Sequence, residues 1–74
     1  MVIENHNTEV RSRCRTVWDI MRSSKDGEIR LGCLQELLRI GHEVFECQII
    51  GIRTNNRYSV VFISRDDDSF IVHI

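Results

Sequence analysis

With 74 residues the chain makes one small domain, and a domain of this size buries only about 60% of the surface that its unfolded chain exposes. The formal net charge of −1 provides no overall basic field for nucleic acid or anionic lipid, and no apolar run approaches the roughly 20 residues of a membrane-spanning helix. An odd number of widely spaced cysteines, with no signal-peptide pattern, argues against a disulfide framework. We therefore expect an intracellular protein, cytoplasmic or nuclear, and an accessory protein of a virus or phage would fit this description.

The clearest predicted element is a helix over residues 8–24, TEVRSRCRTVWDIMRSS, which follows a flexible polar lead-in at residues 1–7. Asn7 or Thr8 can cap this helix, because a short side-chain oxygen accepts a free backbone N–H. Gly27 favours a stop soon after its end. The apolar residues recur at helical spacing along one stripe, which comprises Val10, Cys14, Val17, Trp18 and Met21.

Two short elements are predicted next. The alternation of polar and apolar residues over Glu28–Leu31 favours a short strand. The following segment, GCLQELLRIG, is typical of a short helix that buries Leu34, Leu37 and Leu38 and ends at Gly41.

The stretch FECQIIGIRTNNRYSVVFIS, residues 45–64, permits two interpretations. One is a hairpin of strand-forming residues that turns at Asn55-Asn56, since asparagine tolerates the positive φ of a two-residue turn. The other is a helix that hands over to a single strand. In both cases RYSVVFIS and SFIVHI are strands joined by the polar turn RDDD.

We favour the helix, over Glu43–Arg53. Phe45, Ile49 and Ile52 fall at i, i+4 and i+7, which is one helical stripe. As a strand, the same segment would place Ile50 and Ile52 on the face opposite Phe45 and Ile49. A large apolar patch would then be left exposed, because the helices cannot cover both faces of a three-stranded sheet.

The segment DGEIRLGCLQELLRIGHEVFECQIIGIRTNNRYSVVF resembles winged-helix domains of the helix-turn-helix superfamily in its apolar spacing. The resemblance implies an α+β domain over residues 8–74, with the order helix, short strand, two helices and C-terminal β-hairpin. The alternative fold is two helices packed on a three-stranded antiparallel meander. The core positions that the resemblance implies are Ile29, Leu31, Leu34, Leu38, Phe45, Ile49, Ile52, Tyr58 and Val60. From the apolar stripes we also expect the largest side chains to be buried together, namely Trp18, Leu34, Leu38, Phe62 and Phe70.

No pattern in the sequence indicates chemistry. Cys33, His42 and Cys47 lack the paired spacing of structural zinc ligands, so we expect reduced, packed thiols. A three-aspartate run without the glycine and distal glutamate of a calcium loop is typical of a solvated turn. The four glycines stand apart, so no phosphate-binding loop is present. We expect no enzyme activity, no cofactor, no metal and no small-molecule substrate.

Binding remains, and two classes of partner stay open. The resemblance implies a regulator that binds duplex DNA, with the third helix in the major groove. The acidic turn Asp66–Asp68 would repel the DNA backbone, and this favours a protein-binding adaptor or inhibitor that uses the same surface. A homodimer fits both classes, and we expect no membrane partner. The candidate binding residues are Ile50, Arg53, Asn55, Asn56, Arg57, Arg11, Arg15 and Arg22.

Overall fold

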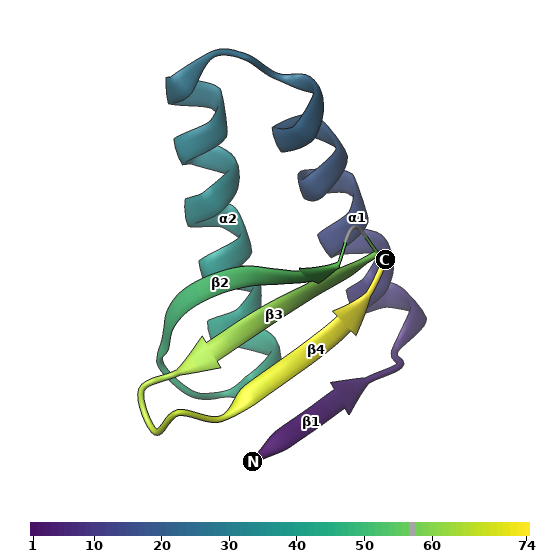
Figure 1. The fold of residues 1–74 in the computed structure, drawn as a ribbon, viewed down its shortest axis with the longest axis vertical. Helices are drawn as coiled ribbons and strands as arrows, with labels where there is room; N and C mark the ends of the chain where they lie inside the picture. Colours follow the sequence, from purple (N-terminus) through teal and green to yellow (C-terminus); the bar gives the residue numbers. More distant parts are fainter. Residues whose placement is uncertain (57) are drawn as a thin grey trace.

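The computed structural model describes residues 1–56 and 58–74, except for the side chains of residues 55 and 56. The described elements are β1 (Val2–Asn5), α1 (Thr8–Ser23), α2 (Gly27–Phe45), β2 (Ile49–Asn56), β3 (Ser59–Ser64) and β4 (Ser69–His73). These strands form one mixed sheet in the order β1-β4-β3-β2, and the two helices form a hairpin on one face of it (Figure 1). The protein is therefore a small α+β domain, as predicted, but the winged-helix order of elements is not confirmed.

Helix α1 agrees with the prediction. The side-chain oxygen of Asn7 accepts hydrogen bonds from the backbone N–H groups of Glu9 and Val10, at 2.9 and 3.1 Å, so this residue is the N-cap. Val10 and Cys14 are buried, and the rest of the predicted stripe packs against the same core. The amphipathic spacing of the sequence was sufficient to identify this helix.

The predicted strand at Glu28–Leu31 is wrong, because this segment forms the first turns of α2. Asp26 caps the helix: its carboxylate accepts the backbone N–H of Glu28 at 2.8 Å and that of Ile29 at 3.4 Å. Gly27 is therefore the first helical residue and does not stop the preceding helix. A four-residue alternation is too short to outweigh a capped helix that continues for five turns.

The predicted helix end at Gly41 is also wrong, because α2 continues to Phe45. Gly41 is buried, and a Cβ atom placed on it would lie 2.6 Å from Cδ1 of Phe62 and 3.0 Å from Cγ1 of Ile49. The missing side chain lets the helix backbone approach the sheet. The helix ends instead at Glu46, which adopts the left-handed conformation with φ 52°.

The helix predicted over Glu43–Arg53 is wrong as well, since α2 ends at Phe45 and strand β2 begins at Ile49. In β2, Ile49 pairs with Ser64 and Ile52 pairs with Phe62, with a register shift between Ile49 and Gly51. Such a bulge inserts one extra residue into the strand. Two side chains three residues apart, which would face opposite sides of a regular strand, then face the same side. Ile49 and Ile52 therefore both pack toward the helices, and their helix-like spacing is explained by the bulge.

Residues 2–5, expected to belong to a flexible lead-in, form strand β1. This strand pairs in parallel with β4, with Ile3 opposite Phe70 and Asn5 opposite Val72. The number of strands thus differs from both expected folds, although the antiparallel part β2-β3-β4 with two helices agrees with the alternative. The carboxylate of Asp68 lies 3.3 Å from the terminal amine of Met1 and helps to hold the strand at the sheet edge.

The core lies between the helix hairpin and the sheet. Phe62 and Phe70 are buried as predicted, and Trp18 and Leu38 are partly buried against the core cluster. Leu34 is 36% exposed, which contradicts its predicted place in the core. The core positions implied by the resemblance are also exposed at Ile29, Leu31 and Tyr58. Other residues complete the buried cluster: Val10, Cys14, Leu37, Ile40, Ile49, Val60 and Val72.

Candidate binding surfaces

The candidate binding residues predicted from sequence fall on separate surfaces. Ile50 is 60% exposed on the edge strand β2. Arg53 pairs with Val61, whose neighbours Val60 and Phe62 face the helices, so Arg53 lies on the face of the sheet opposite the helices. The side chains of Asn55 and Asn56, and all of Arg57, lie outside the described residues. The structure therefore does not bring Ile50 and Arg53 together with the arginines of α1.

The predicted arginines of α1 do share one surface, which we call the arginine stripe: Arg11, Arg15 and Arg22. All three side chains are exposed, and they lie at i, i+4 and i+11 of a continuous helix. Trp18, at i+7, lies on the same side. Among the described residues, Arg11 and Arg22 take part in no ion pair, whereas Arg15 Nε lies 3.8 Å from a carboxylate oxygen of Asp19.

Two hollows follow the arginine stripe. One, of about 300 Å³, is lined by Thr8, Arg11, Ser12 and Arg15. The other, of about 170 Å³, lies where α1 meets the ends of β3 and β4, and its lining residues are Arg15, Trp18, Asp19, Arg22, Tyr58 and Ile74. The backbone N–H of Ile74 donates to the carbonyl oxygen of Tyr58 at 2.6 Å. This hydrogen bond joins the two residues that line the second hollow from the sheet.

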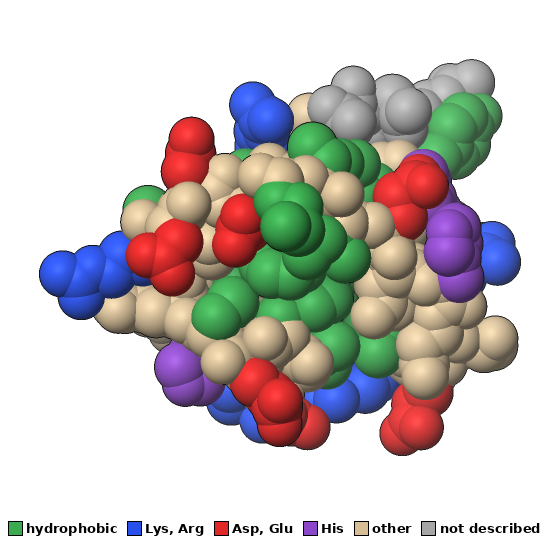
Figure 2. All heavy atoms as spheres, turned by 90° about the horizontal axis from the view of Figure 1, so that it is seen from below, with side chains coloured by type: hydrophobic (Ala, Val, Ile, Leu, Met, Phe, Trp, Pro, Cys, Tyr) green, Lys and Arg blue, Asp and Glu red, His purple; other side chains and the backbone are tan. Residues whose placement is uncertain are grey.

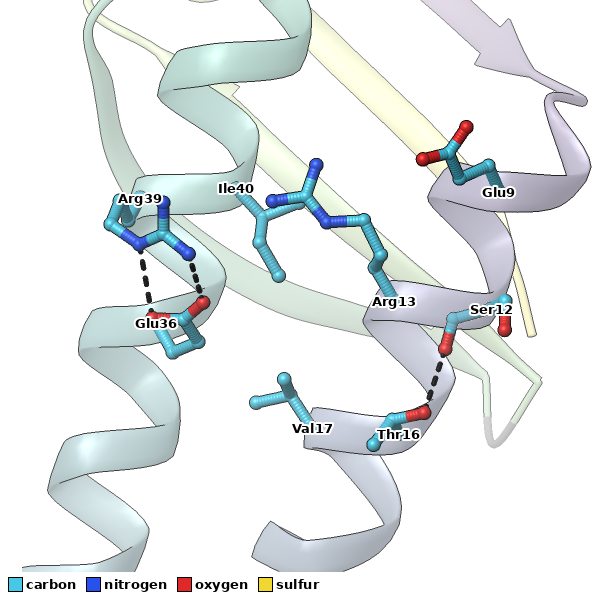
Figure 3. Close-up of a pocket in the computed structure, with 8 residues that line it drawn as sticks. All are labelled: Glu9, Ser12, Arg13, Thr16, Val17, Glu36, Arg39 and Ile40. Carbon is cyan, nitrogen blue, oxygen red and sulfur yellow. Dashed lines mark hydrogen bonds and ion pairs between the residues drawn. The ribbon is translucent and has the colours of Figure 1, made fainter.

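A larger hollow, of about 350 Å³, lies between α1 and α2 and is lined by charged side chains from both helices (Figure 3). Arg13 donates two hydrogen bonds to Glu43, at 3.2 and 3.3 Å. Arg39 donates to Glu36 and also reaches Glu43 at 3.3 Å. Hydrogen bonding to Arg13 lowers the pKa of Glu43, and hydrogen bonding to Arg39 lowers the pKa of Glu36. The charges of this network neutralise one another, and the Arg13–Glu43 pair joins the two helices.

An apolar surface that the sequence analysis assigned to the core lies on α2. Residues 31, 34, 38, 41 and 45 fall at i, i+3, i+7, i+10 and i+14, which is one side of the helix. At the C-terminal end this side packs on the sheet, where the ring of Phe45 stacks on that of Phe70 with centroids 4.3 Å apart. The N-terminal half extends past β2 and has no strand beneath it (Figure 1). We call the following side chains the overhang stripe: Leu31 and Leu34, which are exposed in this part, and Leu38, which packs against the core at the inner end of the stripe.

A polar cluster joins β1, β3 and β4. The ring of His73 lies 2.8 Å from a carboxylate oxygen of Glu4 through Nε2 and 3.2 Å from the hydroxyl of Ser59 through Nδ1. The His6 ring stacks on His73 with centroids 5.9 Å apart. The hydrogen bond to His73 lowers the pKa of Glu4. The side chains of Ser59, His73 and Glu4 lie in a row, but Ser59 is only 2% exposed, so its hydroxyl is closed off from solvent. The contact between His73 of β4 and Glu4 of β1 fastens β1 to the sheet.

The β1 edge also carries exposed apolar side chains. Met1, Val2 and Ile3 are 82%, 68% and 36% exposed. Figure 2, which looks onto the molecule from below the view of Figure 1, shows hydrophobic side chains gathered across the middle of that face, with acidic, basic and histidine side chains around them.

The cysteines are free thiols, with Cys14 and Cys33 buried and Cys47 partly buried. Burial raises the pKa of the Cys14 thiol to about 11. Within residues 1–56 and 58–74, no group of three or more His, Cys, Asp or Glu side chains is placed to hold a metal ion. None of the helices described is long and apolar enough to cross a membrane.

Comparison with protein-family models, with curated proteins and with solved structures gives no match for this chain.

Proposed function

We propose that the protein is a non-catalytic binding module that docks another protein on the overhang stripe. The observation that carries the proposal is the continuity of one apolar helix side from the core into solvent. Leu31 is 55% exposed and Leu34 is 36% exposed, yet both lie in line with Gly41, which touches the sheet. Contiguous exposed apolar side chains of this kind are typical of interfaces with other proteins.

The edge strand β2 supports the same proposal. It is the outermost strand beside the overhang stripe, and its outer backbone groups have no strand partner within the described chain. Ile50, on this strand, is 60% exposed. A partner that covers the overhang stripe would therefore meet an apolar helix side and a strand edge together, which is a combination that peptide-binding domains use.

The proposal favours a protein over duplex DNA for a specific reason. The DNA-binding expectation relied on a third helix over Glu43–Arg53 that would enter the major groove. In this segment α2 ends at Phe45 and β2 begins at Ile49, so the element on which that expectation rested is missing. The turn that contains Asp66, Asp67 and Asp68 also adds negative charge at the end of the β3–β4 hairpin.

The proposal of a non-catalytic role rests on the polar clusters described above. The arginines and glutamates between α1 and α2 neutralise each other in pairs, and none of them is held in a buried, unpaired state. Ser59 is covered by its surroundings, so its hydroxyl is not presented to a substrate. Catalytic groups usually combine access with a perturbed environment, and these clusters lack that combination.

Site-specific photo-crosslinking tests the docking proposal. A photoreactive phenylalanine analogue at Leu31 should form adducts with the partner in cells that produce the protein, because this position would lie inside the interface. The matched control is the same analogue at Asp66, an exposed residue of the β3–β4 turn, which is not part of the overhang stripe.

A second substitution makes the result specific. Leu34→Asp should remove the adducts formed from position 31 and leave the far-UV circular dichroism spectrum unchanged, because the side chain already contacts solvent. Equal adduct yields from positions 31 and 66, or adducts that survive Leu34→Asp, would show that the overhang stripe is not the docking surface.

A further inference from the structure

A second surface, independent of the overhang stripe, is suited to a different ligand. Arg11, Arg15 and Arg22 project from one side of α1 and span about 16 Å along the helix axis, since each helical residue rises about 1.5 Å. Neutralising side chains are scarce here. Among the described residues that line the two hollows beside the stripe, Asp19 is the one acidic side chain, and its distance of 3.8 Å from Arg15 is that of a loose pair.

Aromatic side chains stand between these arginines. Trp18 is partly buried and lines the same hollow as Arg15 and Arg22, and Tyr58, which is 59% exposed, lines it from the sheet side. Aromatic rings beside arginines offer stacking surfaces to flat ligands, in addition to the positive charge. A simple solvated helix face would not combine hollows, aromatic rings and arginines in this way.

From this arrangement we infer that the arginine stripe and the aromatic hollow beside it form a binding site for single-stranded nucleic acid. The arginines contact successive phosphates, and an unpaired base enters the hollow lined by Trp18 and Tyr58. Single-stranded chains fit this chemistry because their bases are free to stack on aromatic side chains, whereas the bases of a duplex are stacked on each other. The charge complementarity is local, and it coexists with the overall net charge of −1.

Trp18 provides the readout, because it is the single tryptophan of the chain. Titration of the full-length protein with an oligothymidylate of about 12 nucleotides should quench the tryptophan fluorescence as a base stacks on the ring. The observed association constant should fall with salt, with a slope of about −2 in a plot of log K against log salt concentration, as expected for three phosphate contacts on a single strand.

Matched variants separate this site from general electrostatic attraction. Arg15→Gln and Arg22→Gln should each weaken binding about fivefold near 0.1 M salt and reduce the magnitude of the slope by about 0.7. Asp19→Asn should strengthen binding, because it removes the negative charge in the hollow. The control is Arg65→Gln, an exposed arginine on the β3–β4 turn, which should bind like the parent. Circular dichroism of each variant confirms that the fold is kept.

Several outcomes would overturn the inference. One is fluorescence that does not respond to the oligonucleotide at low salt. Another is an equal loss of affinity in Arg65→Gln and Arg22→Gln, which would indicate diffuse charge attraction. Equal affinity for a duplex of the same length would exclude the single-strand assignment, and equal affinity for a polyglutamate peptide would exclude nucleic acid as the class of ligand. None of these results depends on the overhang stripe, so this inference and the docking proposal fail separately.

Discussion

Gly41 of α2 lies so close to Phe62 of β3 that a Cβ atom on the glycine would stand 2.6 Å from Cδ1 of the ring. Real Cβ atoms do not approach other heavy atoms to this distance, so a side chain at position 41 would force the helix or the side chain of Phe62 to move. This contact fixes the distance between the two layers at the centre of the core.

Two glycines of the same helix provide a direct test of this contact. Gly41→Ala should lower the free energy of unfolding by about 1–3 kcal/mol, because the added methyl group overpacks the core against Phe62. Gly32→Ala should raise it by about 0.5–1 kcal/mol, since no atom lies within 4 Å of the new methyl group and alanine favours the helix. Urea unfolding measures both. If the two variants shift stability in the same direction, the close approach at Gly41 is not tight in solution.

The two sides of α2 should differ in their tolerance of truncation. Leu37 is fully buried, so Leu37→Ala should lower the free energy of unfolding by about 2–5 kcal/mol. In so small a domain, this loss is enough to unfold most molecules at room temperature. Leu34→Ala should cost less than about 1 kcal/mol, because this side chain is 36% exposed on the overhang stripe. Thermal unfolding followed by circular dichroism compares them. A larger loss in Leu34→Ala would place Leu34 in the core after all.

The ion pair between the helices should make stability depend on acid. The pKa of Glu43 is lowered, chiefly by its hydrogen bonds to Arg13, so the folded state favours the ionised carboxylate. This contribution is present above the ordinary glutamate pKa of 4.5 and is lost as the pH falls through the lowered value. Glu43→Gln should therefore flatten the loss of stability between about pH 5 and pH 3.

Urea unfolding at a series of pH values provides the measurement for Glu43→Gln. Asp66→Asn is a suitable control, since Asp66 is an exposed carboxylate in the β3–β4 turn and takes part in no ion pair among the described residues. An acid profile of Glu43→Gln that matches the parent would show that the Arg13–Glu43 pair is too exposed to solvent to contribute.

The three thiols should react at different rates. Cys14 is fully buried and burial raises its pKa to about 11, so both access and thiolate formation are suppressed. Cys47 is more exposed and should be alkylated first by iodoacetamide, which peptide mass spectrometry can resolve. In denaturant the difference should disappear. Preferential labelling of Cys14 in the native protein would contradict the packing of α1 on the sheet.

The sequence by itself determined the elements whose stabilising interactions are local. Asn7 and the apolar spacing from Val10 to Met21 specify α1, because an N-cap and an amphipathic period act within a few residues. The β3–β4 hairpin follows in the same way from two apolar runs around a polar turn. The arginine stripe was also visible, since side chains at i, i+4 and i+11 must share one side of a helix once the helix is identified.

Only the tertiary structure decided the remaining features, because each depends on a partner that is distant in sequence. Val2–Asn5 carries no strong strand pattern, and it becomes β1 through its pairing with β4 at the other end of the chain. The bulge at Ile49–Gly51 gives a strand the apolar spacing of a helix, and its register with β3 is what distinguishes the two. Leu34 and Leu37 look alike in the sequence, but one is exposed and the other buried, because the sheet ends at β2 while the helix continues beyond it.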